Sequence, residues 1–208
     1  MNINLSSIGM EKGQKYEGII TSTNSDNSMN AAPIGILCDG EMKIKCRIFK
    51  TSKTLSNILE NKEFTVNITD NPILFTFATI DNIPNDYYDE NNILKDIDAF
   101  FTCKLQESEE TIKHDDPVKQ SEAILIRADV EKIVLKNNCA KAMNRGIHAL
   151  IESLVNYTRI DIVNKEKQDY YLDRIIESER VINKVGSPKE KEAITILKDK
   201  ITNKGYKF

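Results

Sequence analysis

The chain has 208 residues and a mass of 23.7 kDa, with 40% hydrophobic and 29% charged residues. It is therefore long enough for one substantial core, or for one core and a small accessory domain. A formal net charge of -3 and a pI near 5.6 exclude a general nucleic-acid-binding protein, which shows a basic excess on one face. No stretch approaches the ~20 apolar residues of a membrane span, and no signal-peptide core stands at the N-terminus. We expect no nucleic-acid or membrane partner.

The cysteines are widely spaced and form no C-x-x-C pair; they are Cys38, Cys46, Cys103 and Cys139. Zinc sites use closely spaced ligand pairs, and only His114 and His148 are available to assist. We therefore expect free structural thiols, no metal site, and a reduced, cytoplasmic compartment.

The first two thirds of the chain are predicted to be rich in β-structure. Short runs of apolar and β-branched residues alternate with turn-forming clusters such as 24–28 and Asp39-Gly40. In 43–49, three apolar residues alternate with basic ones, which is the pattern of a strand with one buried face. The predicted strands are 19–23, 31–38, 43–49, 64–68, 73–80, 100–106 and 123–135.

One short helix is expected within this strand-rich region. Residues 54–60 place Leu55, Ile58 and Leu59 on one face, as in an amphipathic helix. The polar run 107–120 is expected to form a loop or hairpin tip. Many short strands with one inserted helix favour a closed or nearly closed antiparallel barrel.

From about residue 138 the pattern becomes helical. The first predicted helix repeats apolar residues at i, i+3, i+4 spacing, namely Ile147, Leu150, Ile151, Leu154, Val155 and Thr158. A second helix is predicted over 165–184 and is ended by Gly186. Ser187, Pro188 and Glu190 then form a capping box with proline at the first helical position of a third helix. We predict a barrel domain over 1–137 and a helical domain over 138–208.

The most informative stretch is a bipartite tract formed by residues 30–36 and 49–58. Its second half has the sequence FKTSKTLSNI, where an extended segment becomes a helix. The first turn of a helix has unpaired N–H groups and a positive dipole end, so nearby hydroxyl and ammonium groups complete a site that favours phosphate. Such groups come from Lys50, Thr51, Ser52, Lys53 and Thr54, with Asn57 one turn further. The alternative is a plain Ser52 or Thr54 N-cap with solvated lysines.

The first half of the tract has the sequence NAAPIGI, whose small side chains expose backbone N–H and C=O groups to a flat ligand. Pro33 lacks an N–H, so we expect the strand to be interrupted there or to lie at a sheet edge. The alternative is an ordinary strand start after a turn. Together the two halves suit a ligand with a planar ring at one end and an anion at the other.

Four stretches follow the order seen in FMN-binding split-barrel proteins: 16–23 (YEGIITST), 30–35 (NAAPIG), 47–58 (RIFKTSKTLSNI) and 64–72 (FTVNITDNP). The chain resembles this superfamily, its flavin reductase-like branch and, within that branch, an uncharacterised archaeal family, the domain of unknown function 447. In that family a helical C-terminus, here around 144–150, follows the barrel. The resemblance implies a mainly β fold with α: a split antiparallel β-barrel with a C-terminal helical appendage.

The resemblance also implies a flavoprotein that forms a homodimer, with FMN near the subunit interface. At the matching positions, the phosphate would be held by Thr51, Ser52, Lys53 and Thr54. The isoalloxazine ring would face the backbone of Asn30, Ala31 and Ala32. The site would be lined by Thr21, Ser22 and Thr23, and Arg47 or Asn57 would support the ribityl-phosphate arm.

The resemblance does not supply an activity. Our first hypothesis is an FMN-dependent oxidoreductase, in which the flavin accepts or donates a hydride and the protein binds and orients it; no catalytic residue is assigned. Because the chain has no G-x-G-x-x-G turn, NAD(P)H or another electron donor would bind transiently over the flavin. The alternatives are a non-enzymatic FMN carrier or sensor that acts through a dimer, and a structural dimerisation module with an empty barrel site.

The roles of three further groups of residues are less specific. Tyr87 and Tyr88 form either a lid over the ring or part of a solvated loop. Arg145 and His148 lie either on a helix surface, where they contact solvent or a second subunit, or in a catalytic site. Residues 114–116 are expected at a loop tip, with no chemistry attached.

Overall fold

The computed structural model describes residues 3–80, 82–111 and 122–207. The chain forms two compact units, Met1–Met143 and Asn144–Phe208, which we call the barrel unit and the helical unit. Residues 138–143, assigned to the second domain from the sequence, pack with the barrel unit. Ala140 and Ala142 are buried in its core, and the Ala142 N–H donates to the Ile8 carbonyl at 2.8 Å. That the two units are independent domains remains a prediction.

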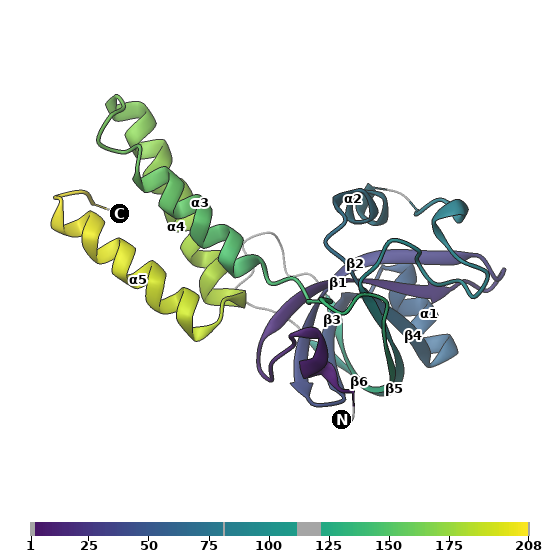
Figure 1. Cartoon of the computed structure of the whole chain (residues 1–208). Helices are drawn as coiled ribbons and strands as arrows, with labels where there is room; N and C mark the ends of the chain where they lie inside the picture. Colours follow the sequence, from purple (N-terminus) through teal and green to yellow (C-terminus); the bar gives the residue numbers. More distant parts are fainter. Residues whose placement is uncertain (1–2, 81, 112–121, 208) are drawn as a thin grey trace. The chain divides into compact units, whose positions relative to one another are not determined.

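Six antiparallel strands close into a barrel in the order β1-β2-β3-β6-β5-β4 (Figure 1). They are β1 (Lys15–Thr23), β2 (Met29–Gly40), β3 (Lys43–Phe49), β4 (Glu63–Ile68), β5 (Ala99–Thr111) and β6 (Ala123–Leu135). Side chains alternate between the two faces of each strand, and the inward ones form one apolar core with residues such as Ile20, Ile44, Val66, Phe101 and Ile126. The predicted antiparallel barrel is confirmed, with β3 and β6 at the expected bounds.

Two short elements cover the barrel interior. The 3-10 helix η1 (Leu5–Ile8) and helix α1 (Lys53–Asn61) both place apolar side chains in the barrel core, among them Leu55 and Ile58 of α1. The wall of a closed barrel has no gap, so side chains from outside the wall reach its interior only through an end. Helix α1 therefore covers an open end of the barrel, and the helix predicted over 54–60 is confirmed.

A second apolar cluster lies on the outer face of the barrel, and here the sequence prediction was wrong. Residues 73–80, expected to be a strand, belong to helix α2 (Pro72–Ile80). Asn71 accepts a hydrogen bond from the Ile73 N–H at 2.9 Å, and Pro72 stands at the first helical position, where its missing N–H costs nothing. Helix α2 buries Leu74 and Ala78 with the 3-10 helix η2 (Asn85–Tyr87) and the segment up to Ile97.

The predicted loop over 107–120 is wrong in its first part. Strand β5 continues to Thr111, and its pairing with β6 runs from Ala99↔Leu135 to Thr111↔Ala123. Ion pairs across this ribbon hold its polar residues in strands: Arg127 contacts Glu107 and Glu109, each at 3.4 Å. Residues 112–120, including the loop-tip residues 114–116, lie outside the described residues.

The helical unit consists of α3 (Arg145–Tyr157), α4 (Lys165–Val185) and α5 (Pro188–Asn203), packed around residues such as Leu150, Ile175 and Leu197. The start of α3 meets the end of α4 closely: a Cβ added at Gly146 would lie 2.8 Å from the Gly186 Cα. The predicted capping box is confirmed, because the Ser187 N–H donates to Glu190 Oε2 at 2.5 Å.

The apolar stripe predicted on the first of these helices is mostly not buried. Leu150 packs in the core of the helical unit, whereas Ile147, Ile151 and Leu154 are 41%, 49% and 45% exposed. His148 is also exposed, as expected for a residue on a helix surface. No helix in the described part of the chain has both the length and the apolar character needed to cross a membrane.

The burial of the thiols predicts their reactivity. At about pH 8, iodoacetamide should modify Cys139, which is exposed, and leave Cys38, Cys46 and Cys103, which are buried. Burial raises the pKa of the Cys46 thiol to about 12 and also raises the pKa of Cys103 and Cys38, and the thiolate is the reactive form. Mass spectrometry of labelled peptides measures the outcome, with the guanidinium-unfolded protein as control. Labelling of Cys46 as fast as Cys139 in the native protein would contradict this core.

Candidate functional site

The end of β1, the start of β2 and helix α1 meet in a buried set of hydrogen bonds that we call the α1 network: Ser22, Asn24, Asn30, Thr54 and Asn57. The Asn30 amide donates to Thr54 Oγ1 at 2.9 Å and to Ser22 Oγ at 3.3 Å. The Asn57 amide donates to Ser22 Oγ at 3.1 Å and to Asn24 Oδ1 at 2.8 Å. Four of the residues predicted for the site are thus brought together, although Ser22 and Thr54 are 32 positions apart (54 − 22) in the sequence.

The network limits what its members can offer to a ligand. The Asn57 amide nitrogen uses its hydrogen atoms inside the protein, so this residue holds α1 in place and has no amide donor left for an anion. Thr54 Oγ1 accepts from Asn30, and its own O–H remains able to donate. Asn57 therefore fits a positioning role. The Thr54 side chain is buried in the same network, so Thr54 fits a contact role through its backbone N–H.

The amino end of α1 carries the groups expected for an anion. Ser52 is the N-cap: its Oγ accepts from the Leu55 N–H at 3.2 Å. The N–H groups of Lys53 and Thr54 precede the first intrahelical hydrogen bond of α1 and point out of its end. The side chains of Thr51 and Lys53 are exposed beside them. The Ser52 hydroxyl is committed, because its O–H donates to the Phe49 carbonyl at 2.9 Å. Two backbone donors, the Thr51 hydroxyl and the Lys53 ammonium group thus remain at this end of α1.

Lys50, predicted from the sequence to belong to this phosphate-binding group, points elsewhere. Its ammonium forms ion pairs with Glu110 at 3.0 Å and Glu122 at 3.1 Å, and these hydrogen bonds raise the pKa of Lys50. The ammonium is therefore committed to the ends of β5 and β6. The sequence could not show this, because the two acidic residues lie 60 and 72 positions further along the chain (110 − 50 and 122 − 50).

The first half of β2 is a sheet edge, which bears out the expectation from Pro33. Residues from Met29 to Leu37 pair with β1, but pairing with β3 begins only at Ile36. In an antiparallel pair, alternate residues direct both their N–H and C=O away from the partner strand. Along 29–35 these backbone groups have no strand partner among the described residues. Asn30, Ala31 and Ala32 therefore lie on a backbone edge without a second strand, next to α1, where Asn30 and Ala31 are buried and Ala32 is half-buried.

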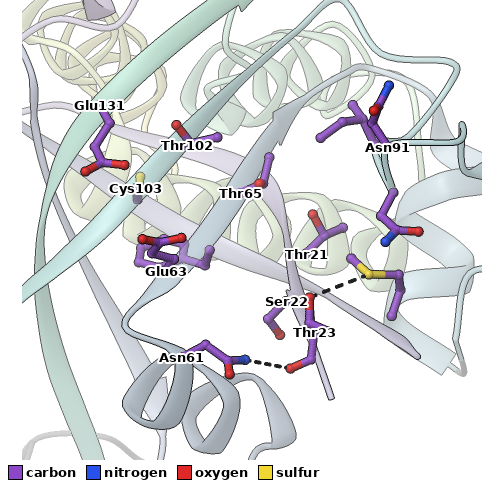
Figure 2. A pocket seen from close by; sticks show the side chains of 14 residues that line it. Thr21, Ser22, Thr23, Asn61, Glu63, Thr65, Asn91, Thr102, Cys103 and Glu131 are labelled. Carbon is purple, nitrogen blue, oxygen red and sulfur yellow. Dashed lines mark hydrogen bonds between the residues drawn. The ribbon is translucent and has the colours of Figure 1, made fainter. Parts of the chain in front are cut away.

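The other face of β1 borders a separate cavity of about 370 Å3 (Figure 2), which we call the outer cavity. Thr21 and Thr23 line it, and Ser22 borders both the cavity and the α1 network. Strand alternation is the reason, because Ile20 points into the barrel core and Thr21 points outward. Residues 51–57 do not line the cavity, so the predicted lining residues divide between two places.

The remaining candidates lie apart from the α1 network. Arg47 is half-buried on β3, with its guanidinium carbon 5.7 Å from the centroid of the Phe49 ring. Tyr88 is buried in the outer apolar cluster, where burial raises its pKa to about 12, and Tyr87 packs edge-on against Phe77. The tyrosine pair is therefore not part of a solvated loop, and Tyr88 has almost no exposed face for a ring to cover.

Sequence reasoning missed two asparagines. Asn24 completes the α1 network, and Asn67, fully buried on β4, donates to the Ile19 carbonyl at 3.0 Å and to Thr21 Oγ1 at 3.1 Å. The available signal was weak: Asn67 is a polar residue inside an otherwise apolar strand, FTVNI, and such a residue needs a partner when buried. Among the described residues, no group of three or more His, Cys, Asp or Glu side chains is arranged to hold a metal ion.

Two family models match the chain. The N-terminal domain model of the protein of unknown function DUF447 matches residues 16–132, and the C-terminal model of the same family matches residues 144–199. Among solved structures, an FMN-bound protein of this family from Methanosarcina mazei is 27% identical, with a TM-score of 0.51, over 94% of this chain and 99% of that chain.

Two other solved structures are similar to part of the chain. Nitrilotriacetate monooxygenase component B from Bacillus cereus is 16% identical over 59% of this chain and 70% of its own, with a TM-score of 0.46. Flavoredoxin from Methanosarcina acetivorans is 13% identical over 59% of this chain and 69% of its own, with a TM-score of 0.45.

The α1 network predicts a stability effect. Asn57→Ala should lower the free energy of unfolding by about 1–3 kcal/mol, because it leaves buried hydrogen-bonding groups of the network without their donor. Ser56→Ala, at the exposed neighbouring position, is the matched control and should change stability by less than about 0.5 kcal/mol. Guanidinium unfolding followed by circular dichroism measures both. Equal stabilities of the two variants would show that the network does not hold α1.

Proposed function

The chain belongs to the DUF447 family, and from this membership and the geometry of the site we propose that it is an FMN-binding flavoprotein, an oxidoreductase of flavin reductase-like type. The 27%-identical family member from Methanosarcina mazei contains FMN and aligns over 94% of this chain, which supports the cofactor assignment. The substrate and the electron donor are left open, and NAD(P)H is one candidate donor.

One observation carries the proposal: the hydrogen bond between Asn30 and Thr54, 2.9 Å long. It joins the open backbone edge of β2 to the amino end of α1. The two halves of the sequence tract, one suited to a planar ring and the other to an anion, are therefore adjacent in space. FMN has a flat ring and a phosphate at opposite ends, so the residues present fit this cofactor.

We assign the roles as follows. Thr51, Lys53 and Thr54 bind the phosphate through hydroxyl, ammonium and backbone N–H groups. Ser52, predicted from the sequence to bind it as well, caps α1 beside the phosphate, because its N–H and O–H both donate to the Phe49 carbonyl. Backbone groups of Asn30, Ala31 and Ala32 contact the ring, and the β1 residues 21–23 line the site. Asn57 positions α1 through Ser22 and Asn24, and Arg47 is the remaining candidate for the ribityl-phosphate arm. When bound, the flavin supplies hydride transfer, and the protein supplies binding and orientation.

We further propose a cytoplasmic homodimer with the cofactor near the subunit interface. The apolar surface of α2 supports an association between copies: residues 72–80 include no charged side chain, yet Ile73 and Ile80 are 53% and 74% exposed. Helices that are apolar all round are usually buried. The free thiols support a reducing compartment.

A carrier or sensor is the second candidate function. It is favoured by the exposed stripe of Ile147, Ile151 and Leu154 on α3, which suits a contact with a protein partner. In this case the chain would bind FMN in the same way and would catalyse no reaction.

The phosphate assignment predicts that Ser52→Asp weakens FMN binding at least tenfold, about 1.4 kcal/mol. Aspartate is as good an N-cap as serine, so the helix should persist while a negative charge faces the phosphate. Riboflavin, which lacks the phosphate, should bind the variant and the wild type equally. Thr195→Asp, which adds the same charge at an exposed position of α5, is the control. Flavin fluorescence titration measures each affinity, and unchanged FMN affinity in Ser52→Asp would place the phosphate elsewhere.

Anaerobic reduction of the bound flavin distinguishes the two candidate functions. If the protein is an oxidoreductase, NADH, NADPH or reduced deazaflavin should bleach the absorbance of bound FMN and should do so repeatedly when an electron acceptor is added. Stopped-flow absorbance measures the rate, with free FMN as control. Rates that do not exceed those of free FMN for all three donors would favour the carrier. A protein that takes up no added FMN would contradict both functions.

A further inference from the structure

The outer cavity differs chemically from the amino end of α1. Its lining comes from β1, β2, β4, β5 and β6, from Asn61 at the end of α1, and from residues 91–93. The only charged side chains in this lining are Glu63 and Glu131, and it includes no lysine, arginine or histidine. Glu63 and Glu131 form no ion pair with the residues that the structure describes. The lining itself therefore carries two negative charges, and strand pairing places Lys104 opposite Glu63 and Lys132 opposite Thr102, beside the lining.

A row of threonines crosses the wall of the cavity. Thr21 pairs with Thr65 across β1 and β4, and Thr65 pairs with Thr102 across β4 and β5. Neighbours in these strands, such as Phe64, Val66, Phe101 and Cys103, point into the barrel core, so the threonines point outward. Paired residues on adjacent strands have Cβ atoms about 4.5–5.5 Å apart. Three hydroxyl groups thus stand in a line across the sheet, with Glu63 and Glu131 in the same wall (Figure 2).

The hydrogen bonds around this row show which groups remain for a ligand. Thr21 Oγ1 accepts from the buried Asn67 amide at 3.1 Å, which leaves the Thr21 O–H to donate. Asn61 donates its amide to the Thr23 carbonyl at 2.8 Å, which leaves Asn61 Oδ1 to accept. The two carboxylates can only accept hydrogen bonds, and the threonine hydroxyls of the lining can accept as well as donate. A ligand that donates several hydrogen bonds would match this lining.

We propose that the outer cavity binds a second small molecule, uncharged or positively charged, that donates hydrogen bonds from hydroxyl or amino groups. Its volume of about 370 Å3 falls in the range of small-molecule sites. A phosphorylated compound is disfavoured there, because its charge would meet two carboxylates in the lining, whereas the neighbouring Lys104 and Lys132 do not line the cavity. The cavity shares residues 21–23 with the proposed flavin site, but residues 51–57, which include those assigned to the phosphate, do not line it. The proposal goes beyond the flavin function, because this ligand binds without flavin.

The position of α1 supports two separate sites. Ser52 and Lys53 stand at its amino end, whereas Asn61, which lines the cavity, is its last residue. Nine helical residues span roughly 13 Å. An anion at the amino end and a hydrogen-bond donor in the outer cavity would therefore lie on opposite ends of one helix, where the dipole also favours opposite charges.

The test compares three probes of one shape and different charge: glucosamine, glucose and glucose 6-phosphate. The full chain is titrated without added flavin, and the amide signals of Thr65 and Thr102 are followed by 15N NMR. We expect saturable shifts with glucosamine and glucose. Glucose 6-phosphate should bind at least fivefold more weakly than glucosamine. Because no flavin is present, a failure of FMN binding would leave this result unaffected.

Two variants assign the shifts to the cavity. Thr65→Val keeps the shape of the side chain and removes a hydroxyl, and Glu131→Gln removes a charge; each should weaken glucosamine binding at least threefold. Glu41→Gln, at an exposed glutamate outside the cavity, is the control and should bind as the wild type does. No saturable shift with any probe, equal or tighter binding of glucose 6-phosphate, or wild-type affinity in both variants would overturn the proposal.

Discussion

Helix α1 is held at the end of the barrel by two kinds of contact that act together. Leu55 and Ile58 enter the apolar core, while Thr54 and Asn57 join buried polar groups of β1 and β2. Apolar burial supplies free energy but little direction, whereas hydrogen bonds between buried groups are costly to misplace. The combination fixes the rotation of α1, so that its amino end faces the open edge of β2. The candidate cofactor site depends on this one placement.

The end of β1 then separates two regions of different chemistry. On one side Ser22 belongs to the α1 network, and on the other Thr21 and Thr23 line the outer cavity. Successive residues of a strand point to opposite faces, so residues 21–23 contribute side chains to both regions. The amino end of α1 offers donors and a cation, and the outer cavity offers acceptors and two carboxylates. One short strand end thus borders a place suited to an anion and a place that disfavours one.

Much of the barrel was predictable because its signals are local. Alternation of apolar and basic residues predicted β3 at its observed bounds, and the capping box at Ser187 predicted the start of α5. Helix α2 was missed because a run of apolar residues has no alternation to distinguish a strand from a helix; the deciding signal was Asn71 followed by Pro72. The far part of β5 was missed because its polar residues are stabilised by partners on β6, such as Arg127 with Glu107 and Glu109.

The sequence by itself determined the element types over most of the chain and the chemical character of the two halves of the tract, because helix caps, strand alternation and small side chains act within a few residues. Only the tertiary structure decided that these halves meet at Asn30 and Thr54, that Lys50 turns to Glu110 and Glu122, and that the threonines of β1, β4 and β5 form one row. Each of these is a contact between distant segments. Such contacts depend on barrel closure and strand register, which no local pattern specifies.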